Sequence, residues 1–237
     1  MLACKDTCEH WTLIHYHTKF GGKHMKISPT LTEVKEIAKT GKYDILPVSC
    51  EILSDFITPI EAMRILQNVS THCYLLESAQ ANEAWGRYTF LGYDPKLEIN
   101  CIDGHMKLGK LSVETENPSE YIRQILSEYK SPKFDYLPSF TGGLVGYFSY
   151  DYLGYKEKSI RGKARDTEDF KDVDLMLFDK VIAFDNLCQK IILIANMSLD
   201  TPETGYNKAI VELKQLRGLL MHGEKKQNMG GKLLGEL

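Results

Sequence analysis

The feature that most constrains the fold is a series of short runs rich in β-branched, aliphatic and aromatic residues, which predict β-strands. Asp103-Gly104 separates two of these runs, and both residues tolerate the positive φ of a hairpin turn. Asp185-Asn186 is expected to turn the last two strands back on each other. Strands joined by such turns are antiparallel. The predicted strands cover residues 45–52, 72–77, 87–92, 96–102, 105–109, 142–150, 175–184 and 188–195.

Amphipathic helices are expected between these strands, because capping residues precede several apolar stretches of helical period. Proline at the first helical position supports three of the starts. Gly41 is expected to end the first helix. Because the helices do not alternate strictly with the strands, the pattern favours an α+β fold, with mainly antiparallel sheets flanked by amphipathic helices. The predicted starts are Thr30 with Glu33, Thr58 with Pro59 and Glu61, Asn117 with Pro118 and Glu120, and Thr201 with Pro202.

The composition excludes several classes of partner. A net charge of −3, without basic clusters between aromatic residues, argues against binding to nucleic acid or to an anionic membrane surface. The longest aliphatic stretch, Ile191 to Ala195, is far too short to cross a bilayer, and no signal peptide opens the sequence. We therefore expect a cytoplasmic protein. The six cysteines follow no regular spacing, so reduced thiols are expected.

Three segments differ in character. Residues 1–24 are rich in histidine without a clear period and are interpreted as a tag-like or upstream extension. Residues 25–221 are expected to form the folded domain, and the polar, glycine-containing stretch 222–237 is interpreted as a linker. Cys4, Cys8 and His10 lack the second pair of a structural zinc site, so no metal is expected.

The strongest chemical signal is Glu77-Ser78 at the end of an apolar run, followed by Arg87 at the start of the next predicted strand. A carboxylate can bind a ligand ammonium, a hydroxyl can bond locally, and a guanidinium can bind a carboxylate. The three could therefore hold a free amino acid. Polar residues that merely cap a strand, and an exposed strand arginine, are alternative interpretations.

The glycine-rich motif indicates a structural role and not a binding or catalytic one. Gly142, Gly143 and Gly146 sit among apolar and aromatic residues, which is unlike a phosphate-binding loop. We expect these glycines to let the strand bend or to let another backbone pass close. The sequence has no nucleophile elbow, P-loop or His-Glu-x-x-His motif.

Four stretches, taken in order, resemble one enzyme family. From about Met25 to Leu237 the chain is similar to the N-terminal half of anthranilate synthase component I, a chorismate-utilising enzyme. The resemblance implies half of a two-domain fold whose catalytic domain lies elsewhere. The stretches are Thr58 to Ala62, Leu75 to Ser78, Gly86 to Gly92, and Gly142 to Asp151.

The resemblance also implies roles for residues and partners. Leu76, Glu77 and Ser78 match the family's L-tryptophan feedback site, and Arg87 matches a basic residue near it. The complete enzyme converts chorismate and ammonia or glutamine into anthranilate and pyruvate, with a magnesium ion in the other domain and a glutamine amidotransferase subunit, component II, as partner. We therefore expect no catalytic residue and no cofactor in this chain.

Two alternatives stay open. Aminodeoxychorismate synthase component I, of the folate pathway, resembles this half closely. A freestanding amino-acid-binding module without activity would carry the same residues.

Overall fold

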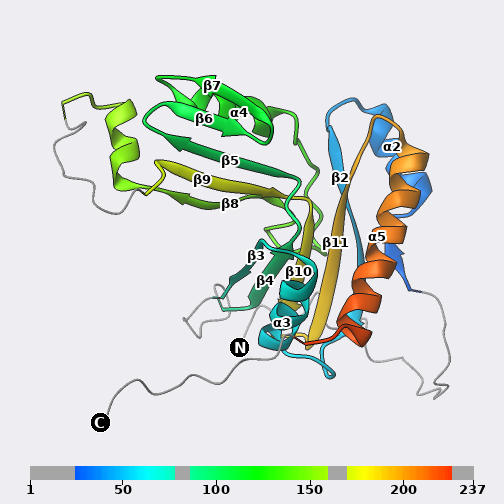
Figure 1. Ribbon diagram of the computed structural model, residues 1–237. Coiled ribbons are helices and arrows are strands. Elements are labelled where there is room, and N and C mark those ends of the chain that lie inside the picture. The colour runs from blue at the N-terminus through cyan, green and yellow to red at the C-terminus, as the bar shows by residue number, and fades with distance from the viewer. Residues whose placement is uncertain (1–24, 78–85, 160–169, 226–237) are drawn as a thin grey trace, which may run out of the picture.

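The computed structural model describes residues 25–77, 86–159 and 170–225, which form two antiparallel sheets (Figure 1). The expected α+β class is confirmed. The first sheet has the strand order β1 (Ile27–Ser28), β2 (Ile45–Leu53), β11 (Lys190–Ser198), β10 (Lys180–Asp185), β4 (Tyr88–Tyr93), β3 (Cys73–Leu76). The second has the order β7 (Leu111–Glu114), β6 (His105–Leu108), β5 (Leu97–Ile102), β9 (Val173–Phe178), β8 (Gly143–Phe148).

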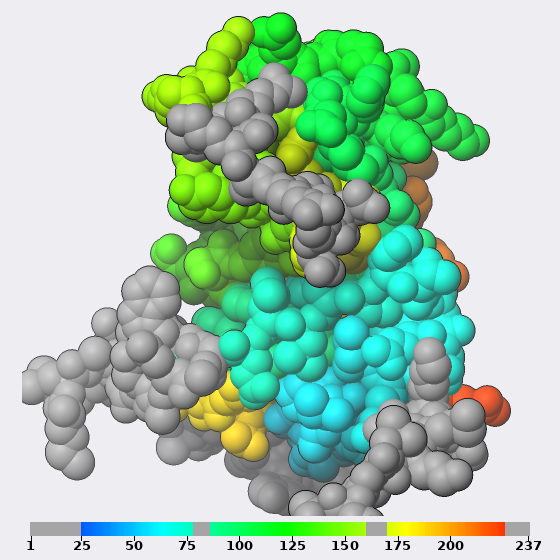
Figure 2. Space-filling model, turned by 60° about the vertical axis from the view of Figure 1, so that its left-hand side comes forward, coloured from blue at the N-terminus to red at the C-terminus, as the bar shows by residue number. Residues whose placement is uncertain are grey.

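Helices cover one face of each sheet. On the first sheet, α2 (Leu31–Lys39), α3 (Pro59–Val69) and α5 (Pro202–His222) bury a core that includes Val48, Leu193 and Leu213. On the second sheet, α4 (Pro118–Ser127) and the 3₁₀ helix η2 (Tyr150–Tyr155) pack on Ile99 and Cys101. Figure 2 shows the second sheet and α4 stacked above α3 and β3.

The other face of the first sheet is covered in part by a loop. Ile192 and Ile194 of β11 and Val181 and Ala183 of β10 are buried beneath Leu137, with Phe134 and Phe140 packed around them. Residues 131–141 form no helix or strand, and the aromatic residues of this loop explain why it stays on the sheet. Burial of this apolar surface stabilises the loop, although the loop contains no helix or strand.

One predicted strand was wrong. Residues 175–184 do not form a single strand, because the chain changes sheet at Asp179: β9 belongs to the second sheet and β10 to the first. The side chain of Asn196 lies at this corner and donates from Nδ2 to the carbonyl oxygens of Asp179, at 3.0 Å, and Thr141, at 2.6 Å. Continuous apolar residues on both sides of Asp179 conceal the corner from sequence analysis.

Strands β1 and β7 were not predicted. The first has two residues, which is too short for a period to appear. The second, Leu111–Glu114, is largely exposed and half polar, so it lacks the apolar run by which the other strands were found. Pairing with β2 and β6 stabilises these two strands.

Two of the four predicted caps are confirmed. Thr30 with Glu33 and Thr58 with Glu61 form reciprocal capping boxes. Asn117 and Thr201 precede helices, but neither side chain caps its helix. The Asn117 side chain instead accepts a hydrogen bond from Ser119 Oγ at 2.6 Å. The helix after Asn117 ends at Ser127, so Tyr129 lies beyond it.

The predicted turns and glycine roles are confirmed. Asp103 and Gly104 have φ of 49° and 86° and join β5 to β6. Gly146 has φ of 153°, and a Cβ there would lie 2.0 Å from the carbonyl oxygen of Asp174 on β9. The backbone of β9 therefore approaches β8 where only glycine fits. Gly41, with φ of 61°, follows the end of α2.

The segment expected to be an extension, residues 1–24, lies outside the described residues, as do residues 226–237 of the expected linker. The four described cysteines, Cys50, Cys73, Cys101 and Cys188, form no disulfide with one another. Among the described helices, none is both long and apolar enough to span a membrane.

Candidate functional site

The candidate site lies at one end of the first sheet, where β3 ends and β4 begins. Strand β3 is an edge strand, and Leu76 is paired with Phe90 of β4. This register places the end of β3 beside the start of β4, so Glu77 and Arg87 emerge at the same end of the sheet. Glu77 is exposed, and Ser78 lies outside the described residues.

An aromatic cluster lies behind Leu76. Tyr74 and Leu76 point to the same face because strand side chains alternate, whereas Leu75 packs into the helical core on the other face. The Tyr74 ring meets Phe178 edge-on, with centroids 4.7 Å apart, and also packs against Phe140. Leu76 remains 46% exposed, so this cluster ends in an open apolar surface beside Glu77.

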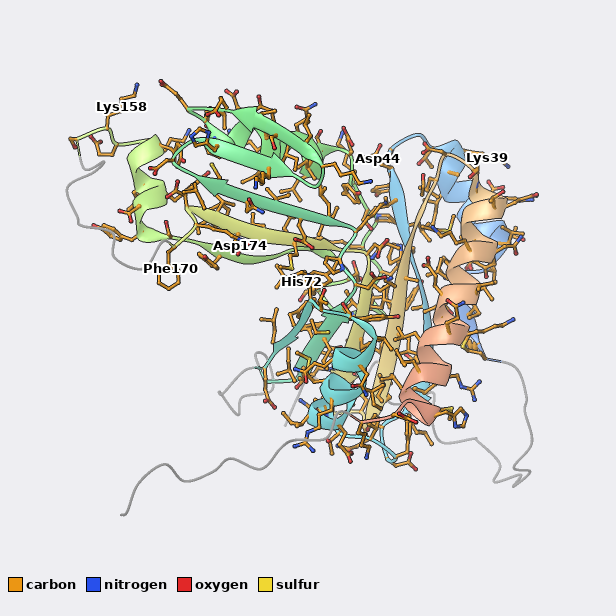
Figure 3. The ribbon with its side chains drawn as sticks, in the orientation of Figure 1. Lys39, Asp44, His72, Lys158, Phe170 and Asp174 are labelled. Carbon is orange, nitrogen blue, oxygen red and sulfur yellow. The ribbon has the colours of Figure 1, made fainter. Side chains whose placement is uncertain are left out.

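The Tyr74 hydroxyl is buried without a hydrogen-bond partner among the described residues. Its ring lies flat on Gly92, where a Cβ would come within 2.2 Å of the Tyr74 ring. Burial raises the pKa of Tyr74 well above its usual range, so the phenol stays protonated. At the start of β3, His72 Nδ1 lies 3.3 Å from Glu98 Oε1 of β5, in the corner between the two sheets (Figure 3).

Arg87 is engaged within the protein. Its Nε donates to Asp185 Oδ1 at 3.1 Å, and its Nη2 donates to Asp185 Oδ2 at 2.8 Å. The guanidinium also lies over the Tyr88 ring, 4.9 Å from its centroid. The hydrogen bond to Asp185 raises the pKa of Arg87 further above its usual range. Burial alone would raise the pKa of Asp185, but the bonds from Arg87 and from the Cys188 amide lower it below its ordinary value.

The turn between β10 and β11 holds the start of β4. Asp185 Oδ1 accepts from the amides of Leu187 and Cys188, at 3.2 and 3.1 Å. Asn186 donates its amide to the carbonyl of Arg87 at 2.9 Å, and its side chain lies 3.4 Å from Thr89 Oγ1. Sequence analysis found Asp185 and Asn186 only as turn residues. The signal that could have identified Asp185 as a site residue is an acidic residue at the end of an apolar strand. The same pattern identified Glu77.

The arrangement offers binding groups of both charges beside an apolar surface. Glu77 presents a carboxylate to solvent. Asp185 accepts from Nε and Nη2 of Arg87, whose side chain is 29% exposed. Nη1 has no hydrogen-bond partner within the described part of the chain, so it can donate to a further acceptor. No group of three or more His, Cys, Asp or Glu gathers in the described ranges in a way that could hold a metal ion.

Sequence comparison identifies relatives of one kind. The chain is 33% identical over 193 residues to anthranilate synthase component 1 of Acetivibrio thermocellus, covering 79% of this chain and 38% of that protein. It is 35% identical over 182 residues to the Pseudomonas aeruginosa protein of the same name, covering 73% and 36%. It is 34% identical over 183 residues to the chloroplastic anthranilate synthase alpha subunit 2 of Oryza sativa subsp. japonica, covering 70% and 30%.

A solved structure is also similar: anthranilate synthase component I from Streptococcus pneumoniae TIGR4, with 25% identity, a TM-score of 0.45, and coverage of 70% of this chain and 36% of that one. No protein-family model matches the chain. The chain spans between 30% and 38% of the length of the three relatives named above. By its sequence similarity to these three relatives, the chain belongs to the anthranilate synthase component 1 family, and the match covers about a third of their length.

Proposed function

We propose that the chain is the N-terminal, regulatory portion of anthranilate synthase component I and binds L-tryptophan as feedback inhibitor at the β3 end. In this proposal Glu77 binds the ligand ammonium and Leu76 contacts the indole. Ser78 bonds to the ligand or the adjacent backbone, and Arg87 offers Nη1 to its carboxylate. The observation that carries the proposal is the exposed Leu76-Glu77 strand end beside a guanidinium fixed by Asp185.

Calorimetric titration of the chain with L-tryptophan tests the binding proposal. Glu77→Gln and Ser78→Ala are expected to weaken binding by about tenfold or more, since each removes a polar contact to a charged ligand group. Glu128→Gln and Ser112→Ala are matched controls, because both residues are exposed and remote from β3. No heat with L-tryptophan, or equal losses in the controls, would contradict a tryptophan site at this strand end.

The activity of the parent enzyme is part of the same proposal: chorismate and ammonia, supplied from glutamine by a component II subunit, become anthranilate and pyruvate in tryptophan biosynthesis. By the resemblance, the magnesium ion and the catalytic groups of the family belong to its other domain. We therefore assign no catalytic step to this chain. Anthranilate fluorescence after addition of chorismate and ammonia to the chain alone is expected to stay at background.

The proposal places the protein in the cytoplasm, in keeping with the absence of a disulfide among the described cysteines. The folate-pathway alternative is not favoured, since the relatives named above are anthranilate synthase components. A freestanding amino-acid-binding module would give the same calorimetry. It would differ in never supporting anthranilate formation when joined to a catalytic domain.

A further inference from the structure

A groove separate from the candidate site lies over the end of β2. It encloses about 660 Å³ and is lined by polar residues and by the exposed ends of strands. Its polar residues are Lys26, Ser28, Ser49, Glu51, Tyr136 and Lys190. We call it the β2 groove. Its volume lies in the range of sites that bind small molecules.

The sheet topology explains why this groove exists. Strand β1 pairs with β2 only through Ile27 with Cys50 and Ser28 with Ser49. Among the described residues, the last residues of β2 therefore have no strand partner on that edge. Ser49 and Glu51 face the side of the sheet covered by the 131–141 loop, since Ile194 and Ile192, their partners on β11, are buried there. Tyr136 of that loop forms the opposite wall.

The charges of the groove favour an anion. Lys190 Nζ lies 2.7 Å from Glu51 Oε1, and its side chain is only 18% exposed. Lys26, which directly precedes β1 and also lines the groove, makes no ion pair with any described residue, and it is exposed. Two ammonium groups therefore face one carboxylate. A ligand carboxylate placed between Lys26 and Lys190 would complete this set of charges.

The groove also supplies neutral donors and an apolar surface. Ser49 Oγ donates to the carbonyl oxygen of Ser28 at 3.2 Å. The Ser28 hydroxyl makes no hydrogen bond with any described residue, so it can bond to a ligand. Burial raises the pKa of Tyr136 to about 12, with Glu33 adding to the effect, so the phenol keeps its proton at neutral pH and can donate. Leu53, also in the lining, is 60% exposed, and the Tyr136 ring stacks on Phe134 with centroids 5.1 Å apart.

Two other cavities are weaker candidates. The one beside α2, of about 410 Å³, includes Glu33, whose carboxylate is already used by the capping box with Thr30. The one on the β6–β7 hairpin is open and includes His105 and Glu114, which are hydrogen-bonded to each other. In the first cavity Glu36 is also paired, with Lys39, and in the second Lys107 is the single lysine of the lining, so neither offers two ammonium groups to an anion.

We propose that the β2 groove binds a small organic carboxylate, with its carboxylate between Lys26 and Lys190 and its apolar body against Tyr136 and Leu53. This site is not the proposed tryptophan site. Strands β11, β10 and β4 separate β2 from β3 in the sheet, a distance of about 19 Å at the usual strand spacing. The proposal rests on the groove alone and stands or falls independently of tryptophan binding.

The probe is 3-phenylpropionate, titrated into the whole chain by calorimetry, with neutral 3-phenylpropanamide as the comparison ligand. The acid is expected to bind and the amide to bind at least about tenfold more weakly, because only the acid carries the charge that the lysines complement. Lys26→Met should weaken binding of the acid by about tenfold, whereas Glu51→Gln should strengthen it, since it removes the competing carboxylate. A merely structural role of Glu51 would not produce a gain.

Lys107→Met on β6 is the matched control, because Lys107 is an exposed lysine of the other sheet, and it should leave binding unchanged. The far-UV circular dichroism of each variant establishes that it is folded, and Lys26 is exposed enough for its loss to be tolerated. Three results would overturn the proposal: no saturable binding of the acid, equal binding of acid and amide, or binding abolished by Glu77→Gln but indifferent to Lys26→Met.

Discussion

The Asp185 carboxylate is wholly buried, a position in which an unpaired charge would be costly. Arg87 and the amides of Leu187 and Cys188 satisfy it, which lowers its pKa and fixes the guanidinium. Arg87 could be selected from sequence because it follows the Glu77-Ser78 motif. Its partner could not, because 98 residues separate the two in sequence and only the pairing of β4 with β10 brings them together.

Asp185→Asn is expected to lower the free energy of unfolding by about 2 to 4 kcal/mol, because it leaves a part-buried guanidinium without its counter-charge. Urea denaturation measures the change. Asp174→Asn is the control: Asp174 pairs with Lys171, but both side chains are partly exposed, so the cost should stay below about 1 kcal/mol. Equal costs for the two variants would show that the Arg87 pair is no stronger than a surface pair.

The same pair predicts a dependence on pH. The pKa of Asp185 is lower in the folded chain than in the unfolded one, so its contribution is complete above about pH 4 and is lost as the pH falls through the folded-state value. The difference in unfolding free energy between wild type and Asp185→Asn should therefore stay constant from pH 7 to about pH 5 and shrink as the pH falls below about 4. Urea titrations at several pH values measure it, and a constant difference would contradict the assignment.

At the scale of helices and strands, the sequence predicted correctly those interactions whose partners lie a few residues apart. The boxes Thr30 with Glu33 and Thr58 with Glu61 span three residues each, and both are present. Of the two roles expected for the glycines, a bend or a close approach of another backbone, the second is confirmed at Gly146 of β8, although the approaching strand, β9, could not be named from sequence. Asn117 shows the limit, because its side chain has a competing local partner in Ser119.

Gly146→Ala is expected to destabilise the chain by at least about 2 kcal/mol, because φ of 153° is unfavourable for alanine and its Cβ would meet Asp174 backbone. Gly218→Ala is the matched control. Gly218 lies inside α5 with open space around its Cα, so alanine should stabilise the helix by about 0.5 to 1 kcal/mol. Thermal unfolding of both variants measures the effects, and a loss in each, or in neither, would refute this account.

At the scale of the whole molecule, two sheets are joined where the chain passes from β9 to β10. Asp179 marks the corner, and Asn196, from β11, bonds to the carbonyls of Asp179 and Thr141 there. Gly142 lets this amide approach, since a Cβ would lie 2.6 Å from Asn196 Nδ2. One side chain thus links the loop over the first sheet to the crossing between sheets.

Asn196→Ala is expected to leave the two carbonyls without this donor and to cost about 1 to 3 kcal/mol. Hydrogen exchange should become faster in β8 and β10, which meet at the corner, than in α4, which does not. Asn100→Ala is the control, because the Asn100 side chain makes no hydrogen bond with any described residue. Uniformly faster exchange across the chain would mean that the mutation lowers global stability without loosening the corner.

The sequence by itself determined the α+β class, the antiparallel hairpins, two capped helices and the polar residues at the end of β3, because each depends on neighbours a few residues apart. Tertiary structure alone decided the change of sheet at Asp179, the partner of Arg87 and the β2 groove. These features depend on pairing between strands that are distant in sequence. The physical reason is that the hydrophobic effect is non-directional: an apolar run indicates that a strand will be buried, but not which strand or helix it will pack against.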